Sequence, residues 1–139
     1  MSRNIEIDME ACTVTDLKID SKKNCYLLDA EAMRKIQEET AVSTTLEPGI
    51  YVIRIRSGSF GYQNNGNKIS EPIVMLWIYG GKFINKKTNL EVEATWSTLN
   101  GDDDTLTLEV LQKTNICAFF FDSYIEDNQG ELTISIVKM

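Results

Sequence analysis

The sequence predicts an all-β protein, an antiparallel β-sandwich or barrel with one short N-terminal helix. Over most of the chain, short segments alternate apolar and polar residues, as strands with one buried face do. Gly and Asn turn signals separate these segments at regular spacing, which is typical of antiparallel β folds. Only one segment places apolar residues at helical spacing. The chain shows no internal repeat and no interdomain linker, so residues 1–139 are expected to form a single domain.

The helix is predicted over Ala30–Thr40. Asp29 can act as its N-cap, and Glu31 lies in the first turn, where the helix dipole favours a negative charge. A narrow apolar stripe at helical spacing is formed by Leu28, Ala32, Met33, Ile36 and Thr40. After residues 41–46, which are expected to leave the helix, Glu47-Pro48-Gly49 predicts a turn.

The remaining elements are predicted to be strands. They are expected at Asn4–Met9, Thr13–Ile19, Ile50–Ser57, Pro72–Tyr79, Lys82–Ile84, Leu90–Ser97, Thr105–Leu111, Ile116–Ile125 and Leu132–Val137. Pro72–Tyr79 is almost continuously apolar, which predicts a central strand buried on both faces. Gly80-Gly81 after it indicates a hairpin turn. Trp77 and Trp96 lie on predicted strands and are expected in the core.

The composition excludes several kinds of chemistry. The chain has no histidine, which rules out Ser-His-Asp and Cys-His nucleophiles and metal sites with imidazole ligands. A net charge of -7 argues against binding to nucleic acids or anionic membranes, which need a basic surface. Cys12, Cys25 and Cys117 form no CxxC pair and are expected to be reduced, free thiols.

The sequence also predicts a cytoplasmic location. Its first twenty residues are polar and acidic and lack a signal-peptide pattern. The longest apolar runs, Ile73–Tyr79 and Ile116–Phe121, are far shorter than the roughly 20 residues that a membrane-spanning helix requires.

The strongest candidate for a metal site is the segment from Asp122 to Gly130. It brings the carboxylates of Asp122, Glu126 and Asp127 close in sequence to the amide of Asn128. Calcium prefers such oxygen ligands when a loop delivers them together with backbone carbonyls. The alternative is a polar hairpin tip in which Asp127 and Asn128 only form the turn.

A second candidate site is the loop Ser57–Asn67, which is rich in glycine and amides and carries almost no charge. Its amides can hydrogen-bond sugar hydroxyls while Phe60 or Tyr62 packs on the apolar face of the ring. Its glycines fit neither a dinucleotide-binding loop nor a P-loop. A surface loop without a ligand is the alternative. The acidic turn Asn100–Asp104 lacks the ligand spacing of an EF-hand and is expected to be solvated.

Three stretches of the chain carry a family resemblance: Gly49–Tyr62, Pro72–Gly80 and Phe121–Ile136. In order and motif they resemble the calcium-dependent, galactose-binding bacterial lectins of the small jelly-roll type. The first resembles a strand that runs into a Gly-aromatic-x-x-Tyr loop, and the last resembles the closing hairpin of that family. The resemblance implies a jelly-roll sandwich of the galactose-binding-domain-like kind. The N-terminal 48 residues lie outside it.

The resemblance also implies a site. Calcium would be held by the backbone carbonyl of Tyr62 and by Asp122, Asp127 and Asn128, and two sugar hydroxyls would complete its coordination. The residues expected around the ligand are Phe60, Tyr62, Gln63, Asn64, Asp122, Tyr124, Asp127 and Asn128. The sugar-contacting histidine of the family has no counterpart in this chain.

We therefore expect a non-enzymatic carbohydrate-binding domain in which calcium assists the recognition of sugar hydroxyls. One alternative is a protein-interaction or structural sandwich that lacks a sugar site and forms homo-oligomers through its helix and exposed strands. The other is a glycosidase that uses Glu126 and Asp122 as acid and base. Any acidic loop offers such a pair of carboxylates, so the signal for an enzyme is weak.

Overall fold

A computed structural model describes residues 14–58, 60–64, 67–121 and 130–139. The contacts within the chain divide it between Ala30 and Glu31 into two units, which are described separately. In the first unit, residues 14–29 contain one turn, at 21–24, and no other regular structure. The carboxylate of Asp20 accepts hydrogen bonds from the backbone N–H groups of Lys22 and Lys23 at this turn, which lowers its pKa.

The strand predicted at Thr13–Ile19 is wrong for its described residues, because 14–19 have no strand structure. The side chains of Val14, Leu17 and Ile19 are each more than three-quarters exposed. An alternating pattern forms a strand only where a neighbouring backbone pairs with it, and the described residues offer none here. The strand predicted at Asn4–Met9 lies outside the described residues.

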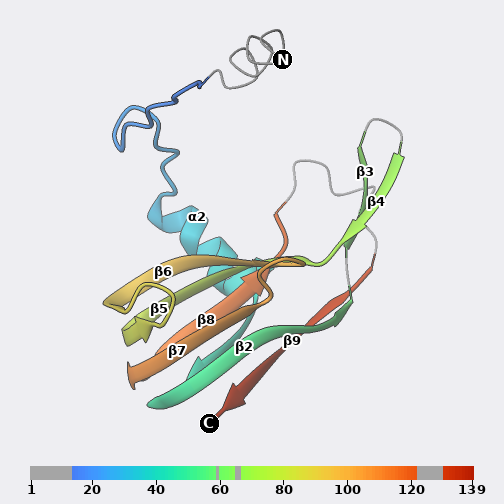
Figure 1. Cartoon of the computed structure of the whole chain (residues 1–139). Helices are drawn as coiled ribbons and strands as arrows, with labels where there is room; N and C mark the ends of the chain where they lie inside the picture. The colour runs from blue at the N-terminus through green and yellow to red at the C-terminus, as the bar shows by residue number, and fades with distance from the viewer. Residues whose placement is uncertain (1–13, 59, 65–66, 122–129) are drawn as a thin grey trace, which may run out of the picture. The chain divides into compact units, whose positions relative to one another are not determined.

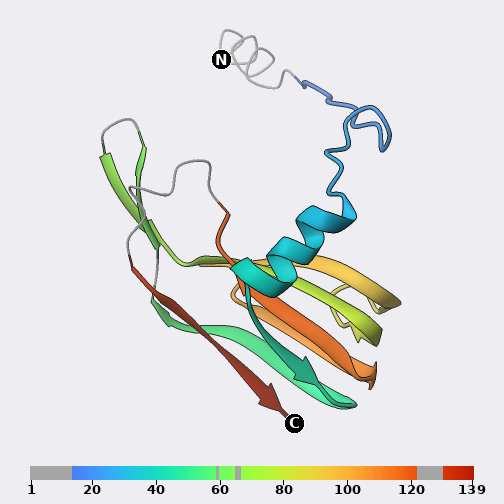
Figure 2. The ribbon, with the colours of Figure 1, turned by 180° about the vertical axis from the view of Figure 1, so that it is seen from behind.

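The predicted helix is confirmed. It consists of α2 (Ala30–Lys35) followed by one turn of π-helix, η1 (Ile36–Thr40). The N–H of Ala41 donates to the carbonyl of Ile36 at 2.9 Å and closes this last turn. No residue of either segment is fully buried, and the predicted apolar stripe is at most half-buried. Figure 2 shows the helix lying in front of one face of the sheet.

The strands of the second unit form an antiparallel sheet and a separate hairpin (Figure 1). The sheet contains β1 (Val42–Leu46), β2 (Gly49–Gly58), β5 (Ile73–Asn85), β6 (Leu90–Asn100), β7 (Thr105–Gln112), β8 (Thr114–Phe119) and β9 (Leu132–Lys138). The hairpin consists of β3 (Phe60–Asn64) and β4 (Asn67–Glu71). The order in the sheet is β1-β8-β5-β7-β2-β9, and β6 pairs with the other edge of β5. The predicted all-β antiparallel class with one short helix is confirmed.

Three predicted boundaries need correction. The residues after the helix form the edge strand β1, which the sequence analysis did not predict, although the β-branched Val42, Thr44 and Thr45 favour extended backbone. The second half of the glycine-rich loop is the β3–β4 hairpin. The strand predicted at Ile116–Ile125 ends at Phe119, with 120–121 irregular and the rest outside the described residues.

The predicted hairpin turn at Gly80-Gly81 is also wrong. β5 runs through both glycines as one strand of 13 residues, with a shift of register between Tyr79 and Phe83. Before the glycines β5 pairs with β8, and after them it pairs with β7, while β6 stays beside it throughout. The glycines therefore form a corner at which the central strand changes one of its neighbours.

The corner requires glycine for steric reasons. Gly80 has φ of +90°, a conformation that other residues rarely adopt. A Cβ atom on Gly81 would lie 2.2 Å from the carbonyl oxygen of Lys113, well inside van der Waals contact. The buried positions of β5 also change at this point, from the even-numbered Val74, Leu76 and Ile78 to the odd-numbered Phe83.

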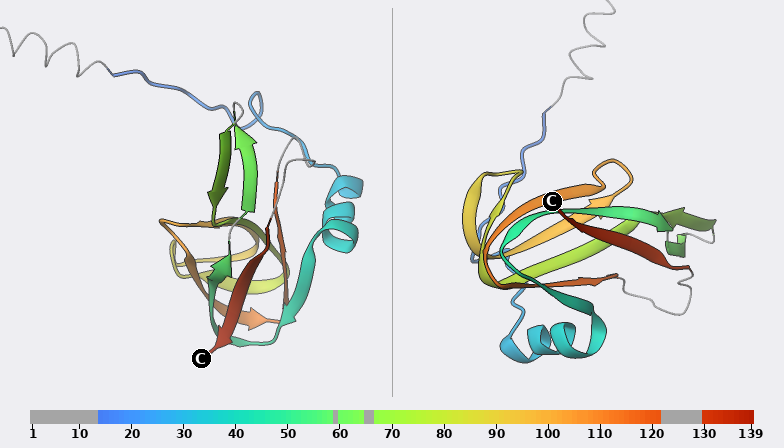
Figure 3. Two further views of the ribbon diagram at one scale, coloured as in Figure 1. Left: turned by 90° about the vertical axis from the view of Figure 1, so that its right-hand side faces the viewer. Right: turned by 90° about the horizontal axis from the view of Figure 1, so that it is seen from below.

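The sheet curls at this corner, so that its two limbs, the parts of the sheet on either side of the corner, face each other across one core (Figure 3). The core residues are Leu46, Tyr51, Ile53, Val74, Leu76, Ile78, Phe83, Leu99, Leu106, Leu108, Val110 and Ile116. β5 is central, as predicted. Its inner face is fully buried, whereas its outer face, which includes Met75 and Trp77, is only half-buried. No helix in the described part of the chain is long and apolar enough to cross a membrane.

We predict that Gly81→Ala destabilises the fold strongly, because the new methyl group would collide with backbone that cannot move without breaking the sheet. The free energy of unfolding in urea should fall by at least about 3 kcal/mol. Gly101→Ala is the matched control, because the nearest atom to its Cβ is Cγ of Pro72 at 3.4 Å. This variant should stay within about 0.5 kcal/mol of the original chain. Equal stability of the two variants would contradict the steric role of the corner.

Candidate functional site

Described residues that flank the two predicted site segments lie side by side at one end of the sheet. The last residue of β2, Gly58, pairs with Leu132, the first residue of β9. A Cβ on Gly58 would lie 2.1 Å from the carbonyl oxygen of Glu131, so the two backbones are in close contact there. The β3–β4 hairpin follows Gly58 in the chain (Figure 1). The segment 122–129, which lies outside the described residues, precedes Gly130 in the sequence. The pairing therefore brings the roots of both segments together.

The structure places half of the predicted site residues. Phe60, Tyr62, Gln63 and Asn64 lie on β3, where Tyr62 pairs with Ile69 of β4. The other predicted residues lie outside the described residues, namely Asp122, Tyr124, Asp127 and Asn128, as does Glu126. The described residues contain no group of three or more Cys, Asp or Glu side chains that could hold a metal ion. The calcium site thus stays a prediction.

The acidic turn after β6 is solvated, as expected. Asp102, Asp103 and Asp104 are all exposed. The Oδ1 atom of Asn100 accepts hydrogen bonds from the backbone N–H groups of Asp102 and Asp103, both at 2.9 Å, and thereby holds the turn. The carboxylate of Asp103 forms an ion pair with Lys87 at 2.6 Å. These contacts account for the turn without a metal ion.

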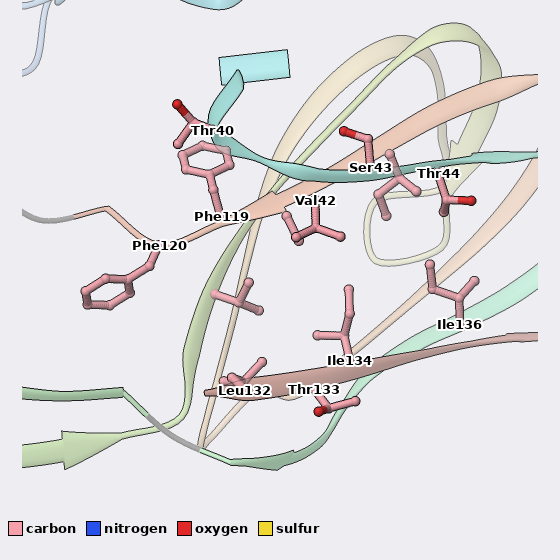
Figure 4. Close-up of a pocket in the computed structure, with 13 residues that line it drawn as sticks. Thr40, Val42, Ser43, Thr44, Phe119, Phe120, Leu132, Thr133, Ile134 and Ile136 are labelled. Carbon is pink, nitrogen blue, oxygen red and sulfur yellow. The ribbon is translucent and has the colours of Figure 1, made fainter. Parts of the chain in front are cut away.

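A cavity of about 660 Å³ opens beside the core, between β1 and β8 on one side and β9 on the other. Its lining is mostly apolar, with a few hydroxyl groups: Thr40, Val42, Ser43, Thr44, Val74, Ile116, Ala118, Phe119, Phe120, Leu132, Thr133, Ile134 and Ile136. Figure 4 shows Val42 and Thr44 of β1 pointing toward Ile134 and Ile136 of β9 across the open space.

The cavity exists because the curled sheet does not close. β1 pairs only with β8, and β9 pairs only with β2, among the residues that the structure describes. The inward side chains of β9, including Ile134 and Ile136, are therefore only half-buried, whereas Ile53 on the neighbouring β2 is fully buried. Sequence reasoning missed this cavity because it did not predict β1. The β-branched residues directly after the helix were the available signal.

An aromatic cluster lies on the outer face of the sheet. Trp77 stacks on Tyr79 with ring centroids 5.8 Å apart, and Trp96 packs against Trp77 at 4.5 Å and against Phe119 at 6.0 Å. Trp96 is 40% exposed, so the prediction that it lies in the core is wrong. Since Leu76 and Ile78 point inward, Trp77 between them must point outward, and Trp96 pairs with it. The indole N–H of Trp77 is buried without an acceptor among the described residues.

The cysteines that the structure describes are free thiols, as expected. Cys25 is exposed, Cys117 is buried, and Cys12 lies outside the described residues. The thiol of Cys117 lies 3.5 Å from the carbonyl oxygen of Trp77. Burial raises the pKa of the Cys117 thiol, and a hydrogen bond with the Ser43 side chain opposes this rise. Burial likewise raises the pKa of Tyr79.

Comparisons with protein families, with curated proteins and with solved structures found no match to the chain.

We predict that Cys117 is inert in the folded protein. Iodoacetamide should label Cys25 and leave Cys117 unmodified until the chain is unfolded, as peptide mapping by mass spectrometry would show. Since the folded pKa of Cys117 is raised, its contribution to stability is complete below its ordinary pKa of 9.0 and is lost as the pH rises above it. Cys117→Ala should reduce the loss of stability between pH 8 and about 9.5. Equally fast labelling of Cys25 and Cys117 in the native state would contradict the predicted inertness of Cys117.

Proposed function

We propose that this chain is a non-enzymatic carbohydrate-binding domain of jelly-roll type, in which calcium assists the recognition of sugar hydroxyls. The single observation that supports it most is the pairing of Gly58 with Leu132, which brings the roots of the two candidate segments together. The composition of one segment suits sugar contacts, and that of the other suits cation ligands. The closeness of the residues that flank them, Gly58 and Leu132, favours one combined site over two unrelated turns.

In this proposal the cation and the hairpin have different tasks. Carboxylates of Asp122 and Asp127, the amide oxygen of Asn128 and the backbone carbonyl of Tyr62 are hard oxygen donors, which suit calcium. Two adjacent sugar hydroxyls coordinate the bound calcium ion. The aromatic and amide residues of β3, Phe60, Gln63 and Asn64, contact the ring and its other hydroxyls.

Two further features support this reading of the site. A net charge of -7 raises the local concentration of cations around the protein. The cavity wall at the end of β8 carries Phe119 and Phe120, apolar surfaces beside the end of the sheet from which segment 122–129 departs. An apolar wall beside polar loops is a common composition of small-ligand sites.

Thermal unfolding with and without calcium tests the proposal. Calcium at 100 times its dissociation constant should stabilise the native state by about 2.7 kcal/mol. For a chain of this length, that corresponds to a rise in melting temperature on the order of 8–10 °C. Asp127→Ala should abolish the rise because it removes a ligand.

Asp102→Ala is the matched control, because it removes one carboxylate from the solvated turn after β6. This variant should keep the full response to calcium. If millimolar calcium leaves the melting temperature unchanged, or if both variants respond alike, the calcium site is wrong. Binding to immobilised sugars that survives EDTA would remove calcium from the mechanism and leave carbohydrate binding alone.

A further inference from the structure

The two strand edges that border the cavity are unprotected. Proteins usually keep exposed edges from pairing with other chains by placing charged residues or proline on them. β6 follows this rule, since its exposed edge carries Glu91 and Glu93. β1 has no charged residue and no proline, and the only charged residue of β9 is Lys138 at its end. The edges of β1 and β9 thus lack the residues that prevent pairing, as do strand edges that pair with another strand.

We propose that the groove between β1 and β9 accepts a strand from a second copy of this chain, and that the inserted strand is its N-terminal segment Asn4–Met9. The inserted backbone would pair with the free edges, and its inward side chains would fill the cavity of about 660 Å³. This is strand addition, in which main-chain hydrogen bonds provide affinity and alternate side chains provide specificity.

The sequence of this segment matches what the groove requires. Ile5, Ile7 and Met9 alternate with Asn4, Glu6 and Asp8, so an extended backbone presents three apolar side chains on one face and polar ones on the other. A strand of six residues is about 20 Å long. Its length lies between those of the acceptor strands, since β1 has five residues and β9 has seven.

Charge also favours these edges over the third one. The segment Asn4–Met9 carries two negative charges and no positive one. The acceptor strands carry no negative charge and one positive charge, that of Lys138. The edge of β6 presents two glutamates, which would repel the same segment. Opposite charges across paired strands stabilise a sheet, and like charges destabilise it.

The length of the connecting chain allows a second copy to supply the strand. Residues 1–30 and the sheet belong to separate units. Residues 14–29 lie between the segment Asn4–Met9 and the helix, are irregular apart from the turn at 21–24, and can extend up to roughly 50 Å. Reciprocal insertion by two copies would give a closed dimer with two-fold symmetry, in which both grooves are filled. This inference does not depend on the calcium site.

Self-association of the full chain tests the inference. By sedimentation velocity over a range of concentrations, the original chain should form a dimer. Ile7→Lys places a charge where an apolar side chain enters the cavity, and it should raise the dissociation constant at least about tenfold. Asn4→Lys adds the same side chain and the same charge to the outward face of the segment, and should change the constant by less than about threefold.

Hydrogen exchange provides the second measurement. The backbone amides of Val42–Leu46 and Leu132–Lys138 should exchange more slowly in the dimer than in the Ile7→Lys variant, while the amides of β6 should not differ. A chain that stays monomeric at all concentrations overturns the proposal, and so does a dimer that Ile7→Lys leaves intact. The original chain could also be monomeric and yet lose the slow exchange of both edges on the Ile7→Lys substitution. That result would place the strand in the groove of its own chain and overturn the assignment to a second copy.

Discussion

The fold depends on the close backbone contact at Gly81. Only a residue without a side chain lets β5 pass within contact of the carbonyl of Lys113, and this passage lets one strand pair with β6, β8 and β7. Every other strand of the sheet then attaches to one of these neighbours, β1 through β8 and β2 and β9 through β7. The curl, the core between the limbs and the open space beside β9 all follow from that corner.

The sequence predicted the strand pattern well because it depends on local alternation. Ile50–Ser57, Leu90–Ser97, Thr105–Leu111 and Leu132–Val137 were located to within a few residues at their ends. The prediction from sequence failed where tertiary contacts determine the backbone conformation. Gly80-Gly81 fits a hairpin turn and a corner equally well by composition, and only the approach of Lys113 distinguishes them. Val14, Leu17 and Ile19 suit a strand, yet no described neighbour pairs with them.

The candidate site, too, could be predicted from the sequence only in part. Composition identified two polar segments, but their proximity follows from the register of β2 with β9, a long-range pairing that local patterns do not encode. The apolar cavity and the exposed side of Trp96 were not foreseen, because each arises from the way in which strands distant in sequence are placed. For this chain, residue types indicate which chemistry is available, and sheet topology determines which groups can act together.

The pairing of β9 has a consequence for folding. β9 is the last strand of the chain, and its only partner in the described structure is β2, which lies near the start of the sheet. Closing so long a loop costs conformational entropy that neighbouring pairs such as β5 and β6 do not pay. We therefore expect β5 and β6 to assemble early and β9 to dock late. The β1–β9 groove then takes shape only in the final step, so nascent chains present the edge of β1 to one another before β9 is in place.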